Sequence, residues 1–260
     1  MADTTTQASG TATAVPLNAP DAGRPDVASS TPRRWLRTLY RGAAASVAVA
    51  AISAIAAYAG IAVAKRQLGP PPLFVAEDLS TVVIDRHGAL LRAFTTADDR
   101  WRLPVSARDV DQRYLAMLFA FEDRNFRTHC GVDVGALSRA VGQLVRHGRI
   151  VSGASTLTMQ VARLLEGRHE RNASGKLKQI VRALQIEERL SKDDILDLYL
   201  RLAPFGGNLE GVRAASIAYF GKEPKRLSVG EAALLVALPQ SPEARRPDRH
   251  ADAALQHTIT

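Results

Sequence analysis

The sequence has a single cysteine, Cys130, among its 260 residues. One thiol excludes a disulfide within the chain, and it neither supports nor excludes a location outside the cytoplasm. No C-x-x-C pair or repeated His/Cys spacing is present, so nothing indicates a structural zinc site. The sequence also lacks an H-E-x-x-H motif, a P-loop and a dinucleotide-binding glycine motif. These absences argue against the common zinc-dependent and nucleotide-dependent chemistries.

Acidic residues are fewer than basic ones, 26 against 34, which gives a formal net charge of +8. A basic chain can bind nucleic acid, an anionic membrane surface or an anionic substrate, and charge alone does not choose among them. Apolar residues make up 46% of the chain, enough for a hydrophobic core. The length suits one domain with accessory segments.

The N-terminal part carries a polar tail and then a long uncharged segment. Residues 1–32 have no apolar periodicity and are typical of a disordered tail. Residues 42–64 contain no charged residue, and a helix of that length can cross a hydrocarbon layer of ~30 Å. Arginines are more numerous before this segment than cations after it, which favours the tail inside and the remainder outside.

We therefore predict a signal-anchor helix over residues 33–66, with the N-terminal tail on the cytoplasmic side of a membrane and the main domain outside. Two alternatives stay open. One is a cleaved signal peptide, because Ala62-Val63-Ala64 resembles a cleavage site. The other is a buried soluble helix, which the lack of a polar face disfavours.

Residues 67–104 are expected to form a spacer and a β-hairpin. Gly69 is followed by three prolines, which make a stiff connection. Strand-like residues 81–85 and 89–95 flank a turn at Gly88, a pattern typical of a hairpin.

Residues 105–245 predict a mainly α domain, because no alternation of strands and helices is present. Ser106 and Asp109 form a capping box that would open a helix running to about Glu122. Further helices are expected from apolar spacing near residues 134–148, 157–165 and 177–184. Capping boxes at Ser191 with Asp194 and at Ser228 with Glu231 would open two more helices. Residues 246–260 read as a C-terminal tail.

Two adjacent carboxylates, Glu122 and Asp123, end a strongly apolar helix face. A carboxylate partly surrounded by apolar side chains suits a general base. The structural alternative is a charged helix end that pairs with Arg124 and Arg127.

Two further segments could bind an anion. In residues 153–163, small and hydroxylated residues precede a helix with the polar stripe Thr156, Gln160 and Arg163. Hydroxyls, free helix amides and an arginine can form an anion or sugar site, although an ordinary helix cap has the same composition. In residues 171–188, Lys178 and Arg182 share a helix face, which could also be a solvated basic surface.

Together these segments resemble glycosyltransferase family 51, the transglycosylase domain of class A penicillin-binding proteins. The motifs are E-D-R-N-F-R-T-H-C-G at 122–131, G-A-S-T-L-T-M-Q-V-A-R at 153–163, S-K-D-D-I-L-D-L-Y-L at 191–200, E-G-V-R-A-A-S-I-A-Y-F-G-K at 210–222 and E-A-A-L-L-V-A-L-P-Q at 231–240. Their order and spacing match the family over roughly residues 105–245.

The resemblance implies a lysozyme-like helical lobe with a smaller membrane-embedded jaw. It implies polymerisation of lipid II into β-1,4-linked glycan with inversion, and release of undecaprenyl diphosphate. The implied partners are lipid II, the growing glycan strand and the cytoplasmic membrane, without nucleic acid. The resemblance also implies a single-pass protein of the bacterial cytoplasmic membrane with the catalytic domain on the outer, periplasmic face. The resemblance allows a separate transpeptidase or other cell-wall synthesis proteins as partners, and a divalent cation (Mg²⁺ or Mn²⁺) at the diphosphate, without an organic cofactor.

The family's catalytic base falls on Glu122. Its substrate-binding positions fall on Asp123, Phe126, Ser155, Thr158, Gln160, Arg163, Arg171, Lys176 and Lys178. Much of the family has a second glutamate where this chain has Gln179, which cannot ionise near neutral pH, so Gln179 is only a possible second-site position. Gly175, Leu164 and Arg201 also depart from the family pattern.

The sequence has no S-x-x-K motif and stops at Thr260, so we expect a monofunctional or truncated protein without β-lactam binding. Two other functions remain open. A lysozyme-like enzyme that cleaves glycan would also use one glutamate, but a neutral glycan needs no cation cluster. A catalytically impaired scaffold would agree with Gln179 and Arg201.

Overall fold

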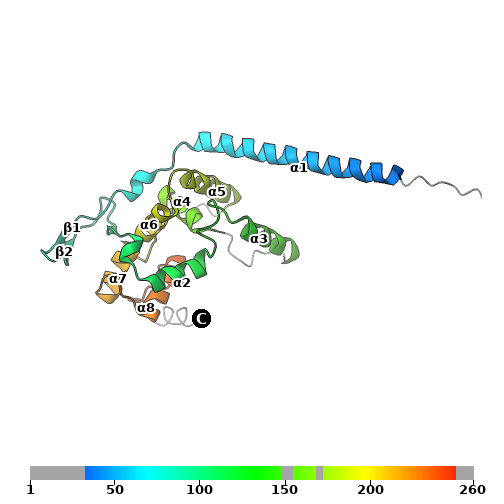
Figure 1. The fold of residues 1–260 in the computed structure, drawn as a ribbon. Helices are drawn as coiled ribbons and strands as arrows, with labels where there is room; N and C mark the ends of the chain where they lie inside the picture. The colour runs from blue at the N-terminus through cyan, green and yellow to red at the C-terminus, as the bar shows by residue number, and fades with distance from the viewer. Residues whose placement is uncertain (1–32, 148–154, 168–171, 250–260) are drawn as a thin grey trace, which may run out of the picture. The chain divides into compact units, whose positions relative to one another are not determined.

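The computed structural model describes residues 33–147, 155–167 and 172–249. The predicted tail at 1–32 lies outside the described residues, as do most of the tail at 246–260, Gly153 and Arg171. Met1–Ala54 and Ile55–Thr260 form two separate compact units. Figure 1 labels the elements along the chain.

Helix α1, Arg33–Leu68, contains the predicted anchor. Its Leu39–Leu68 part is long and apolar enough to cross a membrane, and none of its most apolar stretch is buried within the protein. A buried soluble helix would be covered by other elements, so this alternative is wrong for the described structure. The helix is consistent with a membrane-anchored protein. The side chains of Arg33 and Arg34, at its start, lie outside the described part of the structure.

The predicted hairpin is confirmed, with shorter strands than expected. After the 3₁₀ helix η1 (Leu73–Ala76), strands β1 (Val82–Ile84) and β2 (Leu90–Ala93) pair in antiparallel register. The Asp85 carboxylate accepts hydrogen bonds from the His87 and Ala89 amides, both at 2.8 Å. Gly88 adopts φ +82°, which side chains disfavour, so the turn needs glycine there.

A second, parallel sheet joins distant parts of the chain and was missed in the sequence. Strand β3, Trp101–Arg102, pairs with β4, Leu209–Glu210. The Arg102 side chain, only 4% exposed, binds the Glu210 carboxylate through Nε at 2.8 Å and Nη2 at 2.7 Å. Its Nη1 donates to the carbonyls of Val75 and Asp78 at 2.9 and 2.8 Å. One guanidinium therefore connects η1, β3 and β4.

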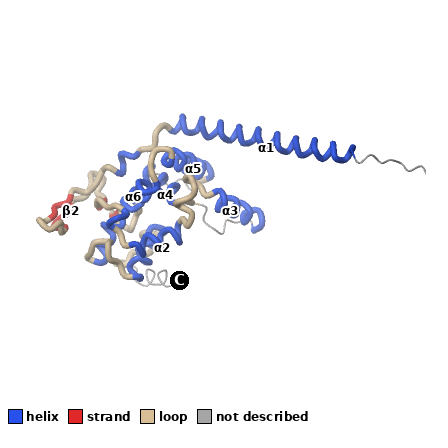
Figure 2. The backbone as a smooth tube through the Cα atoms, in the orientation of Figure 1, coloured by secondary structure: helices blue, strands red, loops and turns tan. Residues whose placement is uncertain are grey.

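Helices dominate the rest of the described chain, as Figure 2 shows in blue. They are α2 Gln112–Glu122, α3 Val134–His147, α4 Leu157–Glu166, α5 Ala173–Glu187, α6 Lys192–Leu202, α7 Val212–Phe220 and α8 Val229–Ala237, with 3₁₀ helices η2 Ala107–Asp109 and η3 Leu238–Gln240. The mainly α prediction is confirmed, and so are the capping boxes that open α6 and α8.

The predicted start of α2 is wrong. The capping box of Ser106 and Asp109 exists, but it opens the short helix η2, which ends at Asp109. Val110 is then extended and buried, which breaks the helical path. The helix restarts at Gln112, where Asp111 accepts a hydrogen bond from the Arg113 amide at 2.9 Å. A buried apolar side chain at position 110 therefore overrides the local capping signal.

The core forms around α6, whose Ile195, Leu196, Tyr199 and Leu200 are at most 1% exposed. Helix α4 packs against both α5 and α6, and α2 packs against α8. This arrangement brings the C-terminal end of α2 close to the polar side of α4.

Candidate functional site

Glu122 is the last residue of α2, and its carboxylate is held by two amides. Gln160 Nε2 on α4 donates to one oxygen at 2.7 Å, and Gln240 Nε2 at the end of η3 donates to the other at 3.1 Å. Neutral donors orient a carboxylate without cancelling its charge. Each oxygen keeps a free lone pair that can accept a proton from a hydroxyl group.

Glu122 and Ser155 both line two clefts. The first has a volume of about 670 Å³ and extends past Asn125, Asp133 and Arg139. The second has a volume of about 480 Å³ and extends past Arg163, Gln179 and Gln240. Glu122 therefore lies at the boundary between the two clefts, where its carboxylate could act as a base on a group bound in either cleft.

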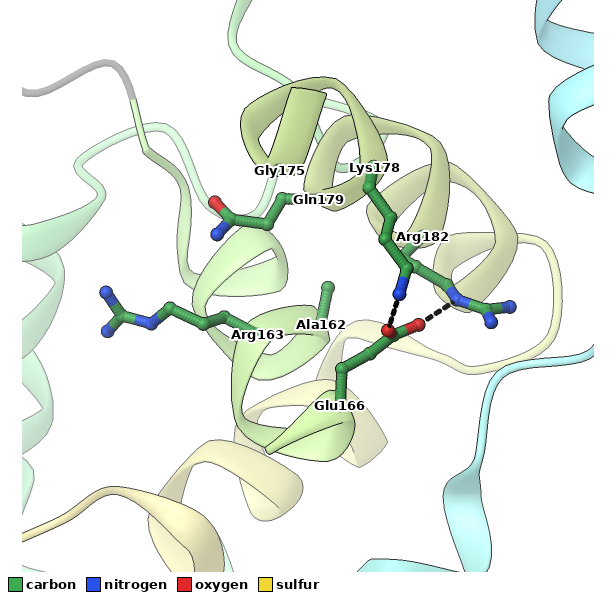
Figure 3. A pocket seen from close by; sticks show the side chains of 7 residues that line it. All are labelled: Ala162, Arg163, Glu166, Gly175, Lys178, Gln179 and Arg182. Carbon is green, nitrogen blue, oxygen red and sulfur yellow. Dashed lines mark hydrogen bonds and ion pairs between the residues drawn. The ribbon is translucent and has the colours of Figure 1, made fainter. Parts of the chain in front are cut away.

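Cations gather beside the second cleft. Arg163 lines both this cleft and a small neighbouring pocket between α4 and α5. In Figure 3, Lys178 and Arg182 both meet the Glu166 carboxylate in this pocket, whereas the Arg163 side chain extends away from it. Burial opposes ionisation of Glu166, but hydrogen bonds from Lys178 and Arg182 outweigh it and hold its pKa below the ordinary value.

Lys176 is half-buried on α5, and its ammonium group bonds the Ser155 hydroxyl. Burial, and then repulsion from the Arg163 charge, lowers the pKa of this lysine. Ser155 also borders both clefts, so it places the Lys176 charge next to the space beside Glu122. The structure thus brings together Glu122, Ser155, Gln160, Arg163 and Lys176, as the motifs predict.

Asp123 is only 7% exposed and lines the first cleft, and its hydrogen bonds are to other residues of the protein. His129 Nδ1 accepts from the Gly131 amide at 3.1 Å, which leaves the proton on Nε2 for donation to Asp123 at 2.9 Å. The same carboxylate accepts from the Leu157 amide at 2.9 Å. Asp123 therefore ties the loop after Glu122 to the start of α4, and its direct contact with a substrate stays a prediction.

Phe126 and Thr158 are also buried, at 1% and 0% exposure. The Phe126 ring stacks on Phe119, with centroids 5.6 Å apart. The Thr158 hydroxyl donates to Glu187 at 2.6 Å. Neither residue lines either cleft, and their predicted contact with a substrate is untested.

Gly131 has a conformation that the neighbouring helix requires. Its φ is +85°, and a Cβ there would lie 3.0 Å from both the Ala183 carbonyl oxygen and Glu187 Cγ. The Thr156 hydroxyl donates to the Gly131 carbonyl at 2.6 Å. The loop that follows Glu122 can therefore approach α5 closely only with glycine at this position.

The departures from the family pattern have distinct places. Gln179 lines the second cleft and the small pocket. Arg201 donates from Nε to the Val105 carbonyl at 3.0 Å and lines neither cleft.

The alternative of ion pairs at the end of α2 is not supported for Arg127, which pairs with Asp193. Gln240 was missed as a site residue because 118 positions separate it from Glu122.

A divalent cation has few protein ligands at this site. Within the described ranges, no three His, Cys, Asp or Glu side chains are placed to hold a metal ion. The second cleft offers one carboxylate, Glu122, with the Gln179 amide. Mg²⁺ commonly takes one or two carboxylates together with phosphate oxygens. The residues do not fit a cation held by the protein alone.

Comparison with known proteins agrees with the motifs. A family model described as "Transglycosylase" matches residues 87–259. The chain is 50% identical over 188 residues to penicillin-binding protein 1C of Escherichia coli, covering 72% of this chain and 24% of that protein. It is 42% identical over 165 residues to penicillin-binding protein 1A of Pseudomonas aeruginosa, covering 64% and 20%.

Penicillin-binding protein 1A of Aquifex aeolicus is 40% identical over 165 residues, covering 64% of this chain and 23% of that protein. The chain thus spans about a quarter of the length of these curated relatives. Residues 182–190, 203–211 and 241–249 resemble the sequence of penicillin-binding protein 1C. This resemblance agrees with the match to penicillin-binding protein 1C of Escherichia coli.

Proposed function

Since this chain belongs to the transglycosylase family, we propose that it is a peptidoglycan glycosyltransferase that polymerises lipid II for cell-wall synthesis. One observation supports this most directly: Glu122 lies between two clefts, and cations gather beside one of them. That asymmetry suits a base between a hydroxyl acceptor and a donor that bears a diphosphate.

Glu122 would accept the proton of the acceptor 4-hydroxyl group while Gln160 and Gln240 hold its carboxylate. The acceptor oxygen then forms a bond to the anomeric carbon of the donor, and the bond from that carbon to the diphosphate oxygen breaks. The leaving diphosphate takes the electron pair. Because the displacement is single, the anomeric configuration inverts.

The developing charge of the leaving group needs positive partners. Arg163 and Lys176 lie next to the second cleft, and Lys178 lies in the adjoining pocket. Diphosphate-bearing donor would therefore enter the second cleft and the acceptor the first. Arg171, outside the described residues, is proposed as a further cation.

Glycan cleavage is less well supported. A glycosidase must protonate a poor alkoxide leaving group, and commonly uses a pair of carboxylic acids. Glu122 is the only carboxylate among the described residues that line the second cleft. Asp123 and Asp133 line the first cleft with it, but both carboxylates already accept hydrogen bonds from the protein. A diphosphate leaves as an anion and needs no such acid.

The cellular setting is proposed from α1 and from the substrate. The anchor would hold the domain at the outer face of the cytoplasmic membrane, where lipid II is displayed. A separate transpeptidase would crosslink the product, and a divalent cation would be bound mainly through the substrate diphosphate.

The full chain in detergent, supplied with labelled lipid II with and without Mg²⁺ or Mn²⁺, tests the proposal. Glycan polymer that lysozyme digests supports it. Fragments released from finished peptidoglycan would instead support a cleaving enzyme. A folded protein that gives neither product would support the scaffold.

Replacing Lys178 by alanine should raise the KM for lipid II by about tenfold with a smaller effect on kcat, because a cation near the diphosphate is lost. Lys225→Ala is the matched control, since Lys225 is exposed and lines none of the three pockets. Steady-state kinetics of both variants decide the point, and an unchanged KM in Lys178→Ala would remove Lys178 from donor binding.

The pH profile should report on Lys176. Its lowered pKa means that the ammonium group loses its proton at a lower pH than an ordinary lysine, whose pKa is about 10.4. As pH rises, kcat/KM should therefore begin to fall at a lower pH than the titration of an ordinary lysine would give. Arginine keeps its charge over this range, so Lys176→Arg should retain activity to higher pH. If kcat/KM falls over the same alkaline pH range in the parent protein and in Lys176→Arg, a group other than Lys176 titrates there.

A further inference from the structure

The C-terminal end of α1 is held by two buried side chains of α5. Arg182 donates from Nη2 to the Leu68 carbonyl at 2.8 Å and from Nη1 to the Gly69 carbonyl at 2.7 Å. Gln185 Nε2 donates to the carbonyls of Lys65 and Gly69 at 3.1 and 3.0 Å. Both side chains belong to residues that are 7% exposed. We call Arg182 and Gln185 the anchor clamp.

The clamp joins groups that attract each other. The last carbonyls of a helix have no partner within it and carry partial negative charge. The guanidinium of Arg182 supplies positive charge and two donors to this end. Water would satisfy these carbonyls equally well in a free helix, so the distinctive effect of buried donors is to fix the position of the helix end.

The clamp also reaches the cation cluster. Glu166 accepts from Arg182 Nε with one oxygen and pairs with Lys178 through the other, as Figure 3 shows. Arg182 additionally donates from Nη1 to Gln185 Oε1 at 2.8 Å. Only two side chains, Arg182 and Glu166, thus separate the end of the apolar helix from Lys178.

We propose that Arg182, Gln185 and Glu166 are positioning residues that hold the cation cluster at a fixed height above the bilayer, where it meets the diphosphate of a membrane-embedded substrate. This inference rests on the proposed function. A prenyl chain in the bilayer confines its diphosphate to the surface layer. A site rigidly joined to the end of an anchor helix meets that layer, whereas a loosely tethered site meets it only part of the time.

The exposed pair between Lys65 and Glu188 connects the same two helices, with the Glu188 side chain 62% exposed. Exposed ion pairs contribute little to the fixed geometry of a protein. Glu188→Gln is therefore a matched control for Gln185→Met. The second change removes the amide bonds to Lys65 and Gly69 and the bond from Arg182 to Gln185 at similar volume, and it keeps the bonds of Arg182 and Lys178 to Glu166.

The test compares full-length proteins on two substrates. In vesicles that contain long-chain lipid II, Gln185→Met should lower kcat/KM by about tenfold, mainly through KM. On a water-soluble lipid II analogue with a short prenyl chain, it should stay within about twofold of the parent protein. Glu188→Gln should behave as the parent on both substrates. Equal losses of Gln185→Met on the two substrates would overturn the proposal.

A depth measurement tests the clamp without catalysis. A spin label at Arg189→Cys, in a Cys130→Ser background, reports its depth through its accessibility to oxygen and to a water-soluble nickel chelate. We expect one narrow depth, which Gln185→Met shifts or broadens. If the parent makes no polymer but the depth changes, the proposed function fails while the clamp stands. An unchanged depth in Gln185→Met would refute the role of the anchor clamp. If circular dichroism shows that Gln185→Met does not fold, the same measurement is made on Arg182→Lys.

Discussion

Replacing Glu122 by glutamine should lower the polymerisation of lipid II by about a thousandfold, within the range that a general base contributes. The amide cannot take the proton of the acceptor hydroxyl. It also fits its surroundings poorly, because Gln160 and Gln240 both donate to the two oxygens of the natural carboxylate. One of the two donors would then face the new amide nitrogen.

Formation of labelled glycan over time, followed by gel electrophoresis, measures the loss. Glu77→Gln is the matched control, since Glu77 is exposed and lines neither cleft. The helix content of both variants should equal that of the parent. A rate for Glu122→Gln within tenfold of the control would assign the base to another group.

Replacing Arg102 by methionine should lower the free energy of unfolding by about 3–5 kcal/mol, the usual effect of breaking a buried ion pair. The change leaves Glu210, whose side chain is 17% exposed, without its main partner. It also leaves the carbonyls of Val75 and Asp78 without the donor that joins η1 to the β3–β4 sheet. For a unit of this size we expect the melting temperature to fall by roughly 10 °C or more.

Thermal unfolding in detergent, followed by circular dichroism, gives this value. Arg100 offers a matched control, because its Nε is 3.7 Å from Glu210 and its side chain is 42% exposed. Arg100→Met should cost less than about 1 kcal/mol. The double variant Arg102→Met with Glu210→Met should recover part of the loss by removing the unpaired charge. Equal melting temperatures for the two single variants would refute the role of Arg102.

Local signals in the sequence predicted the helices well, because periodicity and capping act over a few residues. Helix α4 follows the apolar spacing from Leu157 to Leu165, and Ser191 and Ser228 begin α6 and α8 as their capping boxes predict. Where a local signal met a distant contact, the distant contact prevailed: Val110 is drawn into the core and ends η2 before α2 begins.

The pairing of strands that lie far apart in the chain could not be predicted from the sequence. Strands β3 and β4 have two residues each, too few for an alternating pattern, and their pairing joins residues 108 positions apart. The partners of charged groups were equally hidden. Nothing in the sequence shows that Glu166 bonds both Lys178 and Arg182, or that the Asp123 side chain turns inward to His129.

Several residues that the motifs predict for the site lie close together in the fold, because each motif brings a short set of side chains to one helix end or face. Glu122, Ser155, Gln160, Arg163 and Lys176 meet as the motif order implies. Gln240 completes the carboxylate's environment from the motif at 231–240, in which no site residue was predicted from the sequence. A role for one residue could be predicted from its motif, whereas its bonding partners required the fold.

The uncharged stretch of α1 has 23 residues, 42–64, between Arg41 and Lys65. At 1.5 Å per residue this stretch is ~35 Å long, slightly more than a hydrocarbon core of ~30 Å. Such hydrophobic mismatch is accommodated by tilting the helix or by thickening the surrounding lipid. Because the surplus is only about 5 Å, a bilayer much thicker than average would draw Arg41 or Lys65 toward hydrocarbon, so this anchor should suit a membrane of average or lower thickness better than a thick one.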